Sequence, residues 1–280
     1  LVSLATRLRS APLVALDTET TSLEPHDAAL IGLSLAASAT EVWYLPFGHR
    51  PRGGELAAPA PVRNLPPITD PACAPIADLL RDATVRKAGQ NITYDWQVLR
   101  RAGIELAGVA YDSMLASFVL DPGRRSHAID ALSMEHLGRG MRSYTDLTGK
   151  GAAQIPFAEV PVADAAAYCG ADSATVLALH EIFAPQLREM ALAPLLDDLE
   201  MPLVEVLVDM EWAGIAIDRP LFERLSRDMG AELARLEGEI QAAAGTTFNL
   251  NSPKQLGQVL YEQHQMPVLK KTRTGPSTDA

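Results

Sequence analysis

Two acidic residues separated by one position are the first candidates for chemistry in this sequence. Asp17 and Glu19 lie in the segment Asp17-Thr18-Glu19-Thr20, at the end of a short apolar run. If that run is a strand, both carboxylates point to one face and Thr18 points to the other. Adjacent carboxylates repel each other, so a bound cation and a solvated strand end that begins a turn are the two explanations of the pair.

A second segment, Gln90-Asn91-Ile92-Thr93-Tyr94-Asp95, places an acidic residue at the start of a helical pattern. Asn91 follows a predicted strand and suits the N-cap position of a helix. Asp95 comes four residues later, on about the same helical face. Taken alone, the segment is explained most simply by helix capping, with Asp95 favoured by the positive end of the helix dipole.

The third segment, Tyr168-Cys169-Gly170-Ala171-Asp172, lies inside a long helical pattern. Tyr168 and Asp172 are four residues apart and share a face. Gly170 costs about 1 kcal/mol relative to alanine in a helix interior, which indicates that another element approaches closely there. A partly buried tyrosine beside a solvated aspartate is the alternative to a functional site.

Together the three segments supply four carboxylates and a tyrosine. Two like charges at ~4 Å cost about 1 kcal/mol in water and about 4 kcal/mol at an intermediate dielectric, so a cluster needs positive charge. Mg²⁺ and Mn²⁺ are the natural counter-ions of sites built from oxygen ligands. A pair of such ions about 4 Å apart serves the cleavage of phosphate esters.

The elements that position these residues follow from the hydrophobic pattern. Strand-like runs at 12–17, 29–37 and 41–45 predict an antiparallel meander. A loop rich in Pro and Gly covers 47–75. The pattern then alternates: helix at 76–82, strand at 85–88, helix at 93–101, strand at 109–111, helix from 113 with Asp112 as its cap, and a long helix at 162–187. This order predicts a mixed sheet with helices on its faces.

A second, helical unit is predicted to begin near Pro194. An amphipathic helix over 195–212 is interrupted at 213–215. A charged helix over 221–244 has Pro220 in its first turn and Gly245 after its end. The residues 251–253 cap a further helix that runs to about His264.

The three segments resemble the 3′→5′ proofreading exonuclease domain of bacterial family-A DNA polymerases, of the type that uses Asp, Glu, Asp, Asp and a tyrosine. The matching stretches are DTET at 17–20, GQNITYD at 89–95, YDSMLASFVL at 111–120, LTGKGAAQIPFAEV at 147–160 and YCGAD at 168–172. Beyond them, EMPLVEVLVDMEWAGIAID at 200–218 and FNLNSPKQLGQVL at 248–260 look like the opening of the polymerase domain with its thumb helices. The stretch VLKKTRTGPSTDA at 268–280 looks like the tip of the thumb.

The resemblance implies an α/β, ribonuclease-H-like (DnaQ-like) exonuclease domain over 1–192, with a mixed sheet flanked by helices. It implies that 193–280 form an α-helical thumb segment, the N-terminal part of a polymerase domain that stops before the palm. We therefore expect a fragment of a longer protein, which does not extend primers by itself. The parent protein would be a DNA-directed DNA polymerase that acts in DNA replication and repair.

The resemblance also implies roles for the chemical residues. Asp17, Glu19 and Asp172 would bind a first metal ion, and Asp17 would also contact a second. Asp95 would act through an intervening water, while Tyr168, helped by Glu19, would orient the attacking water. The cofactors would be two divalent ions, Mg²⁺ or Mn²⁺, with Zn²⁺ as an alternative at the first site. The products would be deoxynucleoside 5′-monophosphates released from the 3′ end of DNA.

Candidate substrate contacts come from the same comparison. Leu23 would wedge against the terminal base, with ordinary core packing as the alternative, and Asn91 would position the terminal nucleotide unless it only caps its helix. The bound DNA would be a single-stranded or frayed 3′ end. Thr18 and Gln90, which lie in the motifs, are further candidates for contact with the substrate. A basic cluster would contact the phosphates of DNA, with simple solvation as the alternative: Lys270, Lys271 and Arg273.

Composition and net charge exclude some classes of protein. The 48% hydrophobic content of the 280 residues supplies a packed core, and the net charge of −11 argues against a protein that merely coats nucleic acid. Cys73 and Cys169 are too few for a disulfide framework, which favours reduced thiols of a cytosolic protein. The resemblance implies a bacterial protein of the cytoplasm that is associated with the nucleoid. No membrane association is expected. The partners would be DNA and the palm and fingers of the polymerase, and the chain would be a monomer.

Two other functions fit the same carboxylates and tyrosine. One is an RNA 3′ exonuclease similar to ribonuclease D. The other is a catalytically silent exonuclease fold that only binds DNA. The thumb-like segment argues against the first, and the presence of all four carboxylates argues against the second.

Overall fold

The computed structural model describes residues 1–52, 62–273 and 275–278, which fall into two compact units, Leu1–Gly214 and Ile215–Ala280. Each unit is described by itself. Part of the predicted loop at 47–75, residues 53–61, lies outside the described residues. None of the helices in the described part of the chain is both long enough and apolar enough to cross a bilayer.

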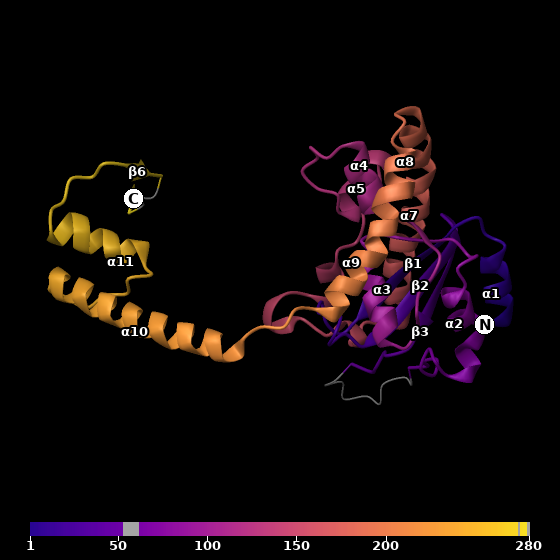
Figure 1. The fold of residues 1–280 in the computed structure, drawn as a ribbon, viewed down its shortest axis with the longest axis horizontal. Helices are drawn as coiled ribbons and strands as arrows, with labels where there is room; N and C mark the ends of the chain where they lie inside the picture. Colours follow the sequence, from indigo (N-terminus) through magenta and orange to yellow (C-terminus); the bar gives the residue numbers. More distant parts are fainter. Residues whose placement is uncertain (53–61, 274, 279–280) are drawn as a thin grey trace. The chain divides into compact units, whose positions relative to one another are not determined.

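The first unit is built on a five-stranded sheet in the order β3-β2-β1-β4-β5 (Figure 1). Its strands are β1 Val14–Thr20, β2 Leu30–Ser38, β3 Glu41–Pro46, β4 Lys87–Gly89 and β5 Val109–Asp112. The first three pair antiparallel, as the short gaps in the sequence predict, whereas β4 and β5 continue the sheet in parallel. The mixed sheet is therefore confirmed, and β1 lies at its centre.

Helices cover this sheet on both faces. They are α1 Val2–Arg9, α2 Ala74–Arg81, α3 Ile92–Arg101, α4 Ser113–Leu120, α5 Ile129–Leu137, α6 Tyr144–Thr148 and α7 Val162–Glu189. Short 3₁₀ turns lie at η1 Pro71–Cys73, η2 Gly151–Ala153 and η3 Phe157–Glu159. Apolar side chains of the strands and helices form one large core, in which Leu16, Leu33 and Leu35 are fully buried.

Helix α7 crosses strands β1, β2, β3 and β4 (Figure 1). Gly170 allows the close approach that its mid-helix position predicts: a Cβ there would lie 3.1 Å from Val42 Cγ1 of β3. Ser34 of β2 fixes the same turn of the helix, because its hydroxyl donates to the carbonyl oxygen of Cys169 at 3.0 Å and contacts Ser173. The helix is thus held at a set height over the end of β1.

Helix α3 begins at one of the predicted segments, but Asn91 does not cap it. Asn91 occupies the N-cap position with a left-handed backbone (φ 57°), and its side chain makes no capping hydrogen bond. Asp112 does this instead, since its Oδ2 accepts from the backbone N–H of Ile92 at 2.7 Å. Its Oδ1 caps α4, as predicted, by accepting from Met114 and Leu115. One buried carboxylate therefore ties two helix starts together.

The first unit extends past the predicted boundary at 192/193. Its last elements are α8 Ala193–Leu195, the π-helical turn η4 Leu196–Glu200 and α9 Met201–Ala213, and α9 lies beside α3 (Figure 1). Gln97 donates to Glu211 at 2.7 Å, and Arg100 pairs with Asp209 at 2.8 Å. Because these contacts join α9 to the sheet domain, the compact unit ends at Gly214. The boundary at 192/193 between the exonuclease and polymerase regions stays a prediction about sequence families.

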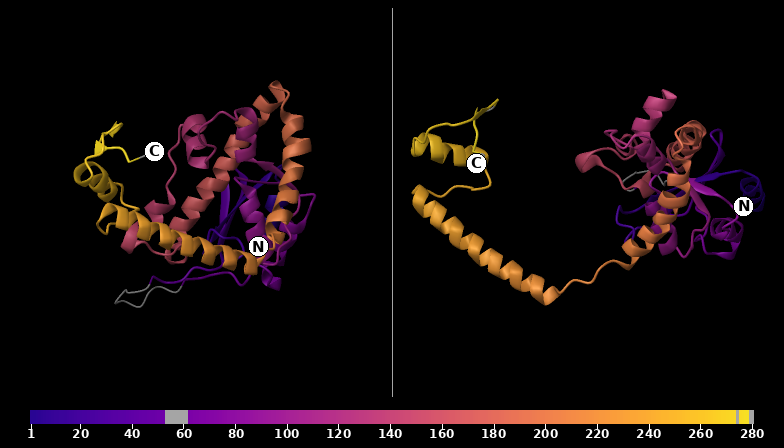
Figure 2. Two further views of the ribbon diagram at one scale, coloured as in Figure 1. Left: turned by 60° about the vertical axis from the view of Figure 1, so that its left-hand side comes forward. Right: turned by 45° about the horizontal axis from the view of Figure 1, so that its top comes forward.

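The second unit follows the predicted helices closely. Helix α10, Arg219–Ala244, is capped by Asp218, which accepts from Leu221 N–H at 3.0 Å, and it ends at Gly245 with φ 66°. Ser252 caps α11, Pro253–Gly257, which continues through the π-helical turn η5, Gln258–Gln263. Figure 2 shows α10 as one long helix followed by the shorter α11. Two short strands, β6 Lys271–Thr272 and β7 Gly275–Pro276, complete this unit.

Gly32 of β2 tests the packing beside the site. A Cβ at this position would lie 1.9 Å from Tyr44 Oη, so Gly32→Ala must displace a ring that is hydrogen-bonded to His49. We expect the free energy of unfolding in urea to fall by about 1–3 kcal/mol. Gly140→Ala is the control, because its new Cβ would meet only an ordinary contact with Met134 at 3.6 Å. Equal stability of the two variants would contradict the packing described here.

Candidate active site

The end of β1 carries the first two candidate residues on the face covered by α7. Asp17 pairs with Ser34 of β2, whose side chain contacts α7, and Glu19 lies two residues further along the same face. The ligand atoms of Asp17, Glu19 and Cys169 all lie within 4.8 Å of one another. The Cys169 thiol donates to Glu19 Oε1 at 3.2 Å. Strand and helix therefore meet through groups that can bind a metal ion.

Asp95 reaches the same strand from α3. Its Oδ1 accepts hydrogen bonds from the backbone N–H of Thr18 at 2.8 Å and from the Thr18 hydroxyl at 2.6 Å. Thr18 alternates away from Asp17 and Glu19, as predicted, and this orientation turns its hydroxyl toward α3. In this structure the Thr18 hydroxyl donates to Asp95. The contact between Thr18 and the substrate stays a prediction.

Helix α7 supplies the remaining two candidates. Tyr168 and Asp172 are both half-buried, and the Tyr168 ring packs near Phe157 with 6.2 Å between ring centroids. The charge of Asp172 acts on Asp17, on Glu19 and on Tyr168. The structure thus brings the five predicted residues from three elements into one neighbourhood, although Asp172 is not in the group whose ligand atoms lie within 4.8 Å.

Burial and mutual repulsion change the protonation of these carboxyl groups. Burial, followed by the charges of Asp95, Asp172 and Glu19, raises the pKa of Asp17 well above its usual range. Burial raises the pKa of Glu19 to about 8, against the lowering effect of its hydrogen bond with Cys169. Burial also raises the pKa of Asp95 and of Asp172 to about 7 each. The charged forms are costly without a positive partner.

One carboxylate oxygen of the cluster lacks a hydrogen-bond donor among the described residues. Asp17 Oδ2 is buried and accepts no hydrogen bond from any described residue. A buried polar atom without a partner is rare and calls for a proton, a water or an ion. Carboxylate oxygens with raised pKa values fit a hard divalent cation, which would stabilise their charged forms.

The sequence reasoning missed three neighbours of the site. Cys169 lies inside a segment that it singled out and shares a face with Asp172, three residues later, so the spacing held a signal. Tyr44 and His49 offered no such signal. Their side chains are hydrogen-bonded at 2.7 Å, and His49 Nδ1 contacts the Val160 carbonyl at 3.1 Å. Burial, then the charges of Cys169, Glu19 and Asp17, raises the pKa of the Tyr44 phenol.

The other predicted substrate contacts lie at the surface or have partners inside the protein. Leu23 is 94% exposed, so it is not a core residue, and Asn91 is also exposed. Gln90 donates to the His127 carbonyl at 2.8 Å and accepts from the Ser113 hydroxyl. The basic cluster of Lys270, Lys271 and Arg273 is exposed in the second unit.

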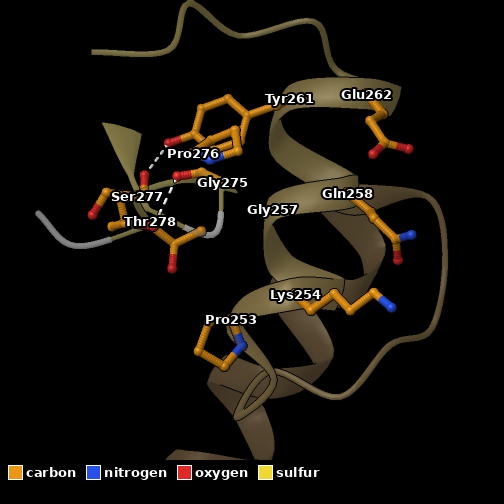
Figure 3. Close-up of a pocket in the computed structure, with 11 residues that line it drawn as sticks. Pro253, Lys254, Gly257, Gln258, Tyr261, Glu262, Gly275, Pro276, Ser277 and Thr278 are labelled. Carbon is orange, nitrogen blue, oxygen red and sulfur yellow. Dashed lines mark hydrogen bonds between the residues drawn. The ribbon is translucent and has the colours of Figure 1, made fainter. Parts of the chain in front are cut away.

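A separate pocket of about 650 Å³ lies within the second unit, between the α11–η5 helix and the segment around β7 (Figure 3). Tyr261 crosses it and donates to the carbonyl oxygen of Ser277 at 2.5 Å. Lys254 and Glu262 are the charged residues of its lining. One carboxylate and one ammonium group do not form a metal-binding cluster, so the candidate active site is the carboxylate cluster of the first unit.

Comparison of the chain with known proteins identifies its family. A family model described as 3′-5′ exonuclease matches residues 1–188. The chain belongs to the 3′-5′ exonuclease family. Residues 219–280 of this exonuclease chain match a second model, DNA polymerase family A. The exonuclease match covers all five candidate residues of the site.

Curated relatives of the exonuclease chain carry the name DNA polymerase I. The protein from Pseudomonas aeruginosa is 40% identical over 97% of this chain and 29% of its own length. The protein from Rhizobium leguminosarum is 38% identical over 95% of this chain and 27% of its own length. The chain thus spans less than a third of these relatives, and it carries the 3′-5′ exonuclease domain of the DNA polymerase I type.

Solved structures show the same architecture. The POL domain of Pol1 from M. smegmatis, in complex with DNA primer-template and dNTP, matches with a TM-score of 0.71 and 25% identity over 100% of this chain and 42% of that chain. Brucella melitensis NrnC matches with a TM-score of 0.53 and 18% identity, over 75% of this chain and 91% of its own, which is a likeness of fold alone. The predicted ribonuclease-H-like α/β exonuclease fold with a helical segment is confirmed.

The raised carboxyl pKa values predict how metal-free protein responds to pH. Because the folded form holds protons that the unfolded chain, with carboxyl pKa values near 4, has lost, stability is highest at low pH. It falls as pH rises above about 4 and levels off above about 7 for Asp172 and about 8 for Glu19. With chelator present, the melting temperature should fall between pH 6.5 and 8, and Asp17→Asn should reduce the slope.

The interval from pH 6.5 to 8 was chosen because other groups with shifted pKa values change the stability mainly outside it. The lowered pKa of His49 acts below about 6.5, and the lowered pKa of Lys87, about 8, acts above the window. A melting temperature that rises with pH in this interval would contradict the burial of the carboxyl cluster. An excess of divalent cation should oppose the fall, since it stabilises the charged carboxylates.

Proposed function

We propose that this chain is a proofreading exonuclease that hydrolyses the last phosphodiester bond at the 3′ end of DNA, with two divalent ions, and releases deoxynucleoside 5′-monophosphates. The observation that carries the proposal is that carboxylates from β1, α3 and α7 act on the charge of Asp17, one of whose buried oxygens accepts no hydrogen bond from the described residues. Apolar surroundings make this arrangement costly unless cations balance it.

The residues divide between two ions. Asp17, Glu19 and Asp172 would hold the first, and Asp17 would share the second with the substrate phosphate, near Asp95. Mg²⁺ or Mn²⁺ suits these oxygen donors, with Zn²⁺ as an alternative at the first position. Such ions supply Lewis acidity to the phosphate, acidify a nearby water and stabilise the leaving oxygen.

The protein's own groups orient the reaction. Burial, then the charge of Asp172, raises the pKa of Tyr168, so its phenol stays protonated at neutral pH and can donate a hydrogen bond that positions water. Glu19, whose charge also acts on Tyr168, can accept a hydrogen bond from that water. The two hydrogen bonds from Thr18 fix Asp95, which limits its movement when charge develops on the phosphate.

Exposed groups in each of the two units suit a strand end that has left the duplex. Leu23 is an isolated apolar side chain in the loop that follows β1, where it can pack against a terminal base without reading its identity. Asn91 is free of capping and can bond a sugar or a phosphate. The basic cluster Lys270, Lys271 and Arg273 stands out in an acidic chain and suits the DNA backbone.

The intact protein would be a DNA-directed DNA polymerase of replication and repair, cytoplasmic and associated with the nucleoid, which acts as a monomer. The palm and fingers would be the partners of the second unit. Exposed apolar residues follow α10 at intervals of three and four, as expected for a helix face that another domain covers. They are Phe222, Leu225, Met229, Leu233, Leu236 and Ile240.

Removing one ligand tests the function. Asp172→Ala should slow Mg²⁺-dependent release of mononucleotides from 3′-labelled single-stranded DNA by about a hundredfold or more, the scale of losing a main electrostatic group. Binding of the same DNA should change little. Asp78→Ala, which removes an exposed carboxylate of α2, is the matched control and should cleave like the wild type.

The same assay separates the other candidates. Wild-type preference for 3′-labelled RNA would support an enzyme similar to ribonuclease D, and complete absence of cleavage with Mg²⁺ and with Mn²⁺ would support a silent DNA-binding fold. Wild-type rates in Asp172→Ala would show that this residue is not a ligand.

Leu23→Ala tests the wedge. Because the side chain is 94% exposed, its removal should cost little stability. If it holds the terminal base out of the stack, cleavage of paired 3′ ends should fall several-fold, whereas cleavage of single strands should fall less. Equal effects on the two substrates, or none, would remove Leu23 from the site. Leu195→Ala, another exposed leucine, controls for surface truncation.

A further inference from the structure

We propose that Cys169 is a further protein ligand at the first metal position, beside Asp17 and Glu19, and that its sulfur gives this metal site affinity for thiophilic cations such as Zn²⁺, Co²⁺ and Cd²⁺. The inference rests on the proposed metal site and deepens it, since it concerns which ions the site selects. It adds a soft donor to a set that the carboxylate motif alone describes as oxygen only.

The distances fit a shared ion. The Cys169 sulfur lies 3.2 Å from Glu19 Oε1, and the ligand atoms of Asp17, Glu19 and Cys169 are all within 4.8 Å of one another. A tetrahedral ion bound to sulfur at about 2.3 Å and to oxygen at about 2.0 Å separates those two donors by roughly 3.5 Å. Small side-chain rotations are enough to bring the three donors to one ion.

The backbone already holds the sulfur in place. Cys169 is fully buried, and its carbonyl oxygen accepts from the Ser34 hydroxyl of β2 at 3.0 Å. Gly170 lets this turn of α7 approach β3, where Val42 would be 3.1 Å from an added Cβ. Cys169 also shares a helical face with Asp172, three residues later, so both side chains turn toward the end of β1.

The unpartnered oxygen of Asp17 also points to an ion at this place. Asp17 Oδ2 is buried and accepts no hydrogen bond within the described parts of the chain, and the Asp17 carboxylate has an oxygen within 4.8 Å of the Cys169 sulfur. The thiol proton serves only one of the carboxylates, Glu19. When a cation binds, that proton is released to solvent, and the ion takes its place between sulfur and oxygen while also reaching Asp17.

The consequence is a change in selectivity. Oxygen donors favour Mg²⁺ and Mn²⁺, whereas a thiolate favours Zn²⁺ and other soft or borderline ions. Mixed donors let the site hold trace Zn²⁺ against a large excess of Mg²⁺. A purely structural thiol, which donates to Glu19 and binds no metal, is the alternative that the experiment must separate.

Cobalt provides a direct readout. We expect metal-free chain titrated with Co²⁺ to develop the near-ultraviolet charge-transfer band that sulfur ligation produces, with one equivalent bound at this site. Cys169→Ser and Cys169→Ala should lose the band. Cys73→Ala is the matched control, because Cys73 is also buried but contacts the Pro66 carbonyl instead of a carboxylate; this variant should keep the band.

Calorimetric titration gives the selectivity. Zn²⁺ affinity should fall by about tenfold or more in Cys169→Ala, since loss of even an outer partner of a ligand costs that much. Mn²⁺ affinity should change by less than about threefold. Thermal melting of each variant reports whether it is folded. Wild-type protein that binds Co²⁺ without the sulfur band, or equal Zn²⁺ affinity in wild type and Cys169→Ala, would overturn the proposal.

These outcomes are separate from those that test the function. Mg²⁺-dependent cleavage of DNA by the wild type without a cobalt–sulfur band would leave the exonuclease intact and remove only Cys169 from the ligand set. A band without any cleavage of DNA would support the ligand set and contradict the proposed function.

Discussion

The negative charges at the end of β1 repel one another where water is largely excluded, and the first unit is built to hold them together. Asp17 and Glu19 are fixed by the centre of the sheet, and Asp95 is fixed by two hydrogen bonds from Thr18. Asp172 is carried by a helix that lies against β3 at Gly170. The carboxylates are held by three different elements, so no single local change relieves the repulsion, and cations can do so for all four at once.

This constraint connects the site to parts of the chain outside the catalytic motifs. Trp212, near the end of α9, stacks on His26 with 4.5 Å between ring centroids, and Arg100 of α3 lies 5.8 Å from the Trp212 ring. His26 belongs to the loop that carries Leu23. The last helix of the first unit therefore supports both the helix that presents Asp95 and the loop proposed to contact the DNA end.

Much of the fold could be predicted because local rules and packing agree. The alternation of apolar residues gave the meander, and Gly245, Ser252 and Asp112 act at helix ends as their residue types predict. Asn91 did not cap α3, and the carboxylate of Asp112, at the end of β5, accepts from the first N–H group of the helix, that of Ile92, instead. The packing of α9 against α3 was not predicted, since an amphipathic pattern does not say which surface covers it. The partners of Thr18, Cys169 and His49 are tertiary contacts, which spacing along the chain does not specify.

Proton release on metal binding tests the central claim most directly. If buried carboxyl groups keep their protons until a cation arrives, binding of Mn²⁺ at pH 6.5 must displace protons into the buffer. Calorimetric titrations in two buffers of different ionisation enthalpy measure that number. We expect release of at least one proton per chain at pH 6.5 and less at pH 8.5, and a clear decrease in Asp17→Asn. Mn²⁺ binding with no proton release at either pH, or no binding at all, would contradict a single buried carboxylate cluster.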